Sequence, residues 1–153
     1  MTIGVEMSLS GGKELDAKLM SLGRKGKTIM AAAVKKGLLP IRPRAKSNAR
    51  QMVGGNMGSL FAKALIVRAV KSRRGAYVMA RLGLSKDYND HFVSISKATG
   101  KRHYIPAAIE YGHDNAAAIP FQRRAADAGR EEAVAAVTAE ARRRIALEVA
   151  KTR

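Results

Sequence analysis

The sequence predicts an α+β fold with an N-terminal strand and helices, a small antiparallel sheet with a hairpin, and a long C-terminal helix. Three observations carry this prediction: apolar residues alternate at the start of the chain, two β-rich segments flank a short basic turn, and about twenty residues near the end of the sequence form an amphipathic pattern. A length of 153 residues and an apolar content of 46% are typical of one domain with its own core. We therefore expect residues 1–153 to form a single domain.

The first half of the chain predicts one strand followed by helices. Residues 2–9 alternate between apolar and small or polar side chains, which indicates a half-buried strand. Ser10 is a favourable N-cap for the segment that follows. Glycines near positions 23–26 predict a break, and Pro40 and Pro43 predict a second interruption. We expect two helices, the second irregular and ending near Arg50. The apolar residues of these two helices recur at helical spacing after Ser10: Leu15, Leu19, Leu22, Ile29, Ala33 and Leu38.

The middle of the chain predicts a hairpin between two flexible loops. Three glycines in residues 51–60 indicate the first loop, and residues 84–102 contain the second. Residues 65–70 and 76–83 are rich in β-formers and should pair as a hairpin. Residues 91–96 resemble a third strand, and residues 97–102 a turn. Residues 103–112 fit either a strand or a short helix.

The C-terminal segment is the clearest helix in the sequence. Pro120 is suited to the first helical turn. Acidic residues lie early in the segment and basic residues late, a charge order that stabilises a helix through its dipole. About twenty residues give a helix of about 30 Å. One apolar stripe runs along it: Val134, Val137, Ala141, Ile145 and Val149.

The composition points toward an anionic partner. Lys and Arg total 29 against 12 acidic residues, a net charge of +17, and such an excess attracts polyanions. The charge is dispersed in short groups, such as residues 42–50, so an ordinary solvated surface remains an equal alternative. Aromatic residues make up only 5% of the chain. This favours contact with a phosphate backbone, without sequence selection, over stacking on single-stranded bases.

The sequence excludes several other classes of protein. It has no Cys, so disulfides and thiolate metal sites are absent. No apolar run approaches the ~20 residues of a membrane helix, and the first residues do not resemble a secretory signal. We therefore expect no membrane partner and synthesis in the cytoplasm.

No residue pattern predicts catalysis. Residues 23–28 end in Gly-Lys-Thr but lack the first glycine of a phosphate-binding loop. The three histidines, His91, His103 and His113, have no metal-binding spacing. Glu110 is isolated, and no pair of acidic groups suggests acid–base chemistry. We expect no enzyme activity, no cofactor and no metal.

Residues 104–127 carry a motif: Glu110-Tyr111-Gly112, a variable loop, then Pro120-Phe121 and a helix. The motif resembles the tail-component family of long-tailed bacteriophages, which contains the tail-completion or head–tail joining proteins of the neck. The order of predicted elements agrees with the family over most of the chain. The chain departs from the family pattern in two ways. It lacks the Pro and the Thr-Gly that the family commonly has before its first hairpin strand, and its segment 84–102 is longer than the family pattern leads us to expect.

The resemblance implies a structural virion protein and not an enzyme. It implies a ring of identical subunits, expected to be a hexamer, between the head connector or stopper and the tail-terminator or tail-tube proteins, with double-stranded DNA in its lumen. Location in the virion follows, with assembly in the host cytoplasm. It leaves open whether the role is tail completion, stopper or tail terminator. The DNA-facing candidates are Lys71, Arg73, Arg74, Lys101 and Arg102.

The family signature and subunit-interface candidates are Glu110, Tyr111, Gly112, Pro120 and Phe121. We expect Gly112 to permit a sharp turn, Phe121 to anchor the last helix on the sheet, and Glu110 to pair with an Arg of its own or a neighbouring subunit. In the simpler alternative, Glu110 is a surface acid and Phe121 an ordinary core residue. The alternative function is a small basic protein that binds nucleic acid without sequence selection.

Overall fold

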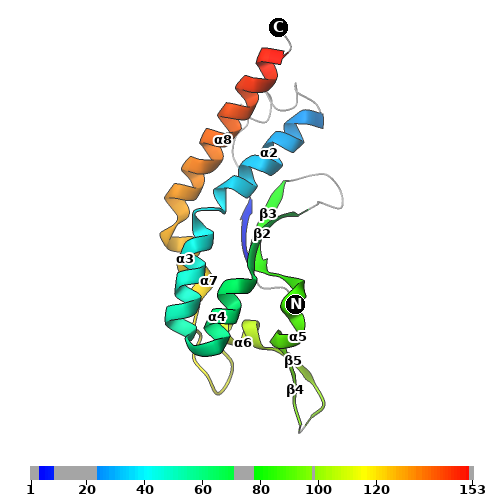
Figure 1. Ribbon diagram of the computed structural model, residues 1–153, viewed down its shortest axis with the longest axis vertical. Helices are drawn as coiled ribbons and strands as arrows, with labels where there is room; N and C mark the ends of the chain where they lie inside the picture. Colours follow the sequence, from blue (N-terminus) through cyan, green and yellow to red (C-terminus); the bar gives the residue numbers. More distant parts are fainter. Residues whose placement is uncertain (1–3, 9–23, 71–77, 98, 152–153) are drawn as a thin grey trace. The chain divides into compact units, whose positions relative to one another are not determined.

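The computed structural model describes residues 4–8, 24–70, 78–97 and 99–151 (Figure 1). It has mixed helices and strands and a long C-terminal helix, so the predicted α+β class is confirmed. The elements in order are β1 (Gly4–Ser8), α2 (Arg24–Gly37), α3 (Ile41–Asn48), the π-helical segment η1 (Ala49–Val53), α4 (Gly55–Ala64), β2 (Leu65–Val70), β3 (Met79–Leu84), the 3-10 turn η2 (Lys86–Tyr88), α5 (Asn89–Phe92), β4 (Val93–Ile95), β5 (Arg102–Tyr104), α6 (Ile105–Tyr111), α7 (Phe121–Ala128) and α8 (Arg130–Lys151).

The chain divides into two compact units, whereas its length predicted one domain. Unit 1 contains residues 1–5, 41–66 and 82–129, and unit 2 contains residues 6–40, 67–81 and 130–153. The chain therefore passes several times between the units, and neither is a continuous segment.

The strands form two small sheets. One has the order β1-β3-β2, which confirms the N-terminal strand and the pairing of the two segments of the predicted hairpin. In the other, β4 pairs antiparallel with β5, and Ile95 lies opposite Arg102. The predicted helix from Ser10 to residue 22 and the hairpin tip at residues 71–77 lie outside the described residues.

Unit 2 is built on the pairing of α2 with α8 (Figure 1). Its core joins Met30 and Ala33 of α2 to Val137 and Ala141 of α8. The small side chains let the two helices approach closely. The predicted stripe on α8 is correct at its centre and wrong at its ends. Val134 and Val149 are 52% and 43% exposed.

Unit 1 has an aromatic core. Phe61 of α4 stacks on Phe121 of α7 with ring centroids 5.3 Å apart, and it meets the edge of Phe92 at the same distance. All three rings are fully buried. Helix α3 packs against α7, and Asn48 on α3 donates to the Phe121 carbonyl oxygen over 3.1 Å. The core brings together segments far apart in the sequence.

The prediction of a flexible loop at residues 51–60 is wrong, because η1 and α4 cover most of it. Gly58 is buried, and a Cβ at this position would clash with the carbonyl oxygen of Ala49. The glycine therefore permits two helical segments to touch. It is a packing residue and not a sign of disorder.

Two further corrections concern the second half of the chain. Residues 84–102, predicted to contain a flexible loop, include η2, α5 and β4, and β4 confirms the third strand predicted at residues 91–96. The predicted C-terminal helix is divided at Gly129 into α7 and α8. A Cβ at position 129 would lie 3.0 Å from Ile41 Cγ1, so close packing explains the glycine.

No helix in the described part of the chain is long and apolar enough to cross a membrane.

Candidate functional site

Glu110 lies at the end of α6, where its side chain is buried with 1% exposed. Its carboxylate accepts two backbone hydrogen bonds. The Gln122 amide donates to Oε2 over 3.0 Å, and the Arg123 amide donates to Oε1 over 2.9 Å. These are the second and third amides of α7, the groups that an N-cap side chain normally binds. Glu110 therefore caps α7 from a different helix.

The beginning of α7 explains why this distant cap is required. The residue at the N-cap position is Pro120, which makes no side-chain cap. Its φ of −79° and ψ of 64°, with a 2.8 Å bond from the Phe121 amide to the Ile119 carbonyl oxygen, form an inverse γ-turn. The Arg124 amide donates to the Pro120 carbonyl oxygen over 3.0 Å. All of the first four amides of α7 therefore have acceptors.

Arg123 closes the site from the solvent side. Its Nη2 donates to the Glu110 carbonyl oxygen over 2.6 Å, and its Nε lies 3.4 Å from Glu110 Oε1. The guanidinium carbon is 4.9 Å from the centre of the Tyr111 ring, within the range of a cation–π contact. Of the two predicted arrangements for Glu110, the pairing with an Arg of the same chain is the one observed. The alternative of a surface acid is wrong, because Glu110 is buried.

Gly112 ends α6 in a conformation that other residues rarely adopt, with a φ of 76° and a ψ of 177°. A Cβ here would lie 2.9 Å from both the Ala116 carbonyl oxygen and the Ala118 nitrogen. The loop that follows is closed at its base, since the Ile119 amide donates to the Ile109 carbonyl oxygen over 2.7 Å. Residues 113–118 are all exposed. The motif thus presents a short closed loop to solvent.

The role expected for Phe121 needs a correction. It begins the short helix α7, and its ring packs against α4 and not against a sheet. It anchors α7 within unit 1, while the last helix α8 begins nine residues later, at Arg130. The motif residues Glu110, Gly112, Pro120 and Phe121 therefore cooperate to fix one helix start and the loop before it.

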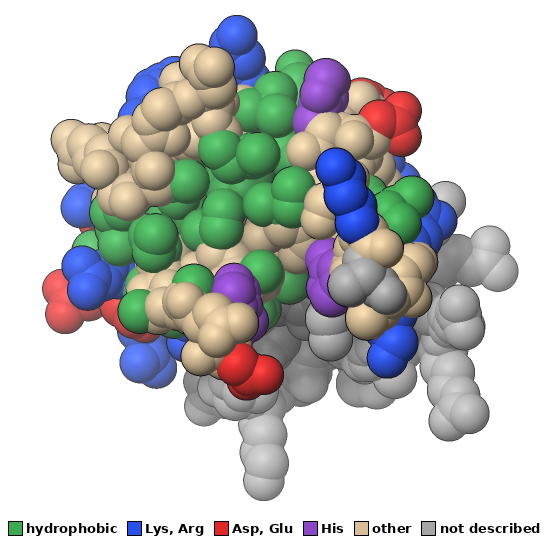
Figure 2. Space-filling view, turned by 90° about the horizontal axis from the view of Figure 1, so that it is seen from below, with side chains coloured by type: hydrophobic (Ala, Val, Ile, Leu, Met, Phe, Trp, Pro, Cys, Tyr) green, Lys and Arg blue, Asp and Glu red, His purple; other side chains and the backbone are tan. Residues whose placement is uncertain are grey.

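The structure describes two of the five predicted DNA-facing residues. Lys101 and Arg102 are exposed on the β4–β5 hairpin, whereas Lys71, Arg73 and Arg74 lie outside the described residues. Ile95 of the same hairpin is 66% exposed. Figure 2, seen from below the view of Figure 1, shows hydrophobic side chains near the centre of this face and Lys and Arg side chains toward its rim.

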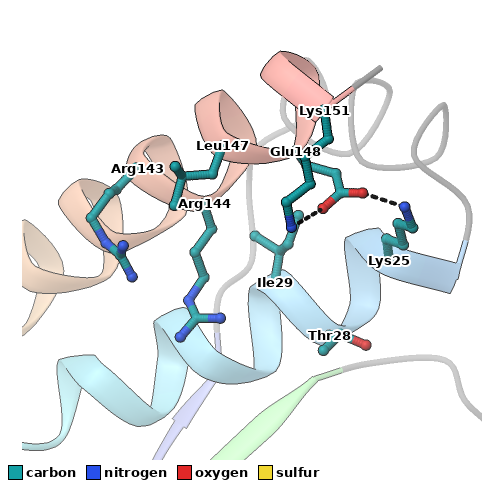
Figure 3. A pocket seen from close by; sticks show the side chains of 8 residues that line it. All are labelled: Lys25, Thr28, Ile29, Arg143, Arg144, Leu147, Glu148 and Lys151. Carbon is teal, nitrogen blue, oxygen red and sulfur yellow. Dashed lines mark hydrogen bonds and ion pairs between the residues drawn. The ribbon is translucent and has the colours of Figure 1, made fainter. Parts of the chain in front are cut away.

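A second candidate is a cavity of about 350 Å³ between α2 and α8 of unit 2 (Figure 3). Ile29 and Leu147 supply apolar lining, and Glu148 pairs with both Lys25 and Lys151. The contact from Lys25 lowers the pKa of the Glu148 carboxyl. Because its lysines have a carboxylate partner, this cavity is a helix–helix seam stabilised by ion pairs, and we do not take it as the functional site.

The remaining sequence candidates do not form a reactive site. Residues 24–28 of the incomplete phosphate-loop motif lie in the first turns of α2. Within the described ranges, no group of three or more His, Asp or Glu side chains could hold a metal ion.

No family model, curated protein or solved structure matches the chain.

Proposed function

We propose that this protein is a structural subunit of the phage neck, a ring-forming tail-completion or head–tail joining protein that surrounds the DNA path. The proposal rests on the resemblance of residues 104–127 to that family. The observation that supports it is the exposed Arg–Tyr pair which the signature residues hold in place. An enzyme role is not part of the proposal.

The Arg123–Tyr111 pair is exposed and preorganised for binding. Tyr111 is 57% exposed and the Arg123 side chain 51% exposed. Arg123 is nevertheless fixed by its bonds to Glu110, so little conformational entropy is lost when it is covered. Tyr and Arg are the residue types that dominate binding energy in protein interfaces. We infer that a neighbouring subunit covers this pair and the adjoining loop.

The test measures ring formation and folding separately. Native mass spectrometry and electron microscopy of the purified protein should reveal a closed ring. Tyr111→Ala should weaken its assembly about 30-fold, the effect of losing about 2 kcal/mol at an interface hot spot. Its circular dichroism and melting temperature should match those of the unchanged protein, because the side chain is exposed.

Ile95→Ala is the matched control, since Ile95 is an apolar residue of unit 1 outside the motif that is also more than half exposed. Its assembly should be unchanged. A chain that stays monomeric at high concentration and is missing from purified virions would refute the proposed function. A ring that forms equally well with Tyr111→Ala would refute the interface.

The alternative function is a small basic protein that binds nucleic acid without sequence selection. The observation in its favour is the net charge of +17. It predicts a monomer whose affinity for DNA falls steeply with salt. A closed ring within virions would reject it.

A further inference from the structure

Three basic residues form a row along α3 and the start of η1. Arg42, Lys46 and Arg50 are spaced by four residues, so they share one side of the helix and are separated by about 6 Å each. Ile41 and Ala45 occupy the buried side. We call Arg42, Lys46 and Arg50 the α3 basic stripe.

The stripe concentrates positive charge on one side of α3 and η1. Among the described residues, no carboxylate forms an ion pair with Lys46 or Arg50. Partial burial lowers the pKa of the Lys46 ammonium, and repulsion from Arg42 and Arg50 lowers it further. Arg42 is fixed in the row because its Nε donates to the Leu65 carbonyl oxygen over 3.0 Å. The fold therefore holds three like charges in a line at an energetic cost.

Four basic residues of unit 2 are arranged differently. On α8, Arg143 and Arg144 both bind Glu140, with contacts of 2.9 and 2.6 Å. Lys25 and Lys151 share Glu148. These residues already have anionic partners, whereas no carboxylate in the described part of the chain pairs with Lys46 or Arg50. An external anion would relieve the repulsion at the stripe.

We infer that the α3 basic stripe binds the phosphate backbone of double-stranded DNA without reading its sequence. The row spans about 12 Å, the length of about three or four successive phosphates of one strand, which follow each other every ~3.4 Å along the duplex axis. Residues 41–53 contain no aromatic side chain on which an unpaired base could stack, and this favours a duplex over a single strand. The inference needs no ring, so it stands separately from the proposed function.

The test measures how the affinity for a random-sequence duplex of about 25 base pairs depends on salt, by fluorescence anisotropy. The variant replaces Arg42, Lys46 and Arg50 together by Gln. Each phosphate contact contributes about 0.9 to the slope of log affinity against log salt, so the slope should become shallower by about 2.7. Between 50 and 200 mM salt, the unchanged protein should lose about 40-fold more affinity than the variant.

The matched control removes three exposed basic residues elsewhere, with Lys35→Gln, Lys36→Gln and Arg142→Gln. The net charge changes by the same amount, but the slope of log affinity against log salt should change by less than about 0.9, the contribution of one phosphate contact. Equal losses in the two triple variants would overturn the inference, because binding would then follow net charge alone.

Two further measurements guard against misfolding. The double variant Lys46→Gln/Arg50→Gln leaves the Arg42 hydrogen bond in place and should reduce the slope by about 1.8. Arg50→Lys keeps the charge and should leave the slope unchanged. An unaltered slope in the double variant would also overturn the inference. Native mass spectrometry of the same samples reports ring formation, so failure of the ring and failure of the DNA site are distinguishable.

Discussion

Replacing Glu110 tests whether a carboxylate on one helix stabilises the start of another. Glu110→Ala removes the acceptor of the Gln122 and Arg123 amides and leaves the rest of α6 in place. Pro120 makes no side-chain cap that could substitute for it. The variant should therefore unfold more readily, and α7 should loosen first.

The magnitude follows from the number of bonds lost and from their burial. A buried donor left without an acceptor costs about 1–3 kcal/mol. The Gln122 amide is buried and the Arg123 amide partly so, which gives a total of about 2–4 kcal/mol for Glu110→Ala. Glu110→Gln keeps the shape and one acceptor oxygen. Its cost should be smaller, about 1–2 kcal/mol.

Urea unfolding followed by circular dichroism measures the free energy, and amide hydrogen exchange locates the change. The amides of Gln122 and Arg123 should exchange faster in Glu110→Ala than in the unchanged protein. Glu131→Ala is the control. This exposed carboxylate in the first turn of α8 should contribute less than about 1 kcal/mol. Equal stability losses at positions 110 and 131, with unchanged exchange at the two amides, would refute the capping argument.

Three other substitutions test features of the same chain. Gly112→Ala should destabilise the protein by at least about 1–3 kcal/mol because of its φ of 76°, and a melting temperature equal to that of the unchanged protein would contradict this. Gln122→Met should raise the melting temperature, since both polar side-chain atoms of Gln122 are buried without a hydrogen-bond partner among the described residues; a lower melting temperature would show that the amide is satisfied. Glu140→Gln should lower the melting temperature at neutral pH but not at a pH where the Glu140 carboxyl is protonated. Hydrogen bonds from Arg143 and Arg144 lower the pKa of Glu140 from 4.5 to about 2, so its contribution is complete above pH 4.5 and disappears as the pH falls toward 2. A difference between the two proteins that persists below pH 2 would contradict the assignment.

The parts of the fold that follow local patterns could be predicted from the sequence. The β-rich composition of residues 65–70 predicted β2, and the amphipathic pattern with its charge gradient predicted α8. Glycine was misleading where its role depends on tertiary contacts. Gly58 and Gly129 lie where another segment approaches too closely for a Cβ, and a sequence pattern cannot distinguish this from a loop or an uninterrupted helix.

The candidate site was predicted in part. The motif identified Glu110, Gly112 and Phe121, and an arginine partner was expected for Glu110, but neither the identity of that arginine nor the capping of α7 was predicted. Arg123 was missed because it lies thirteen residues from Glu110, a separation that no local periodicity marks. The spacing of residues 42, 46 and 50 was visible in the sequence as part of one basic group. Only the structure shows that, among the described residues, Lys46 and Arg50 form no ion pair with a carboxylate.

The loop between Gly112 and Pro120 begins and ends at anchored points. The Ile109–Ile119 hydrogen bond and the carboxylate of Glu110 hold its two ends, and residues 113–118 between them are exposed and lie outside the core. Such a segment can change in length or chemistry while the rest of the chain keeps its structure. An epitope tag inserted after Asn115 should therefore be displayed on a folded protein.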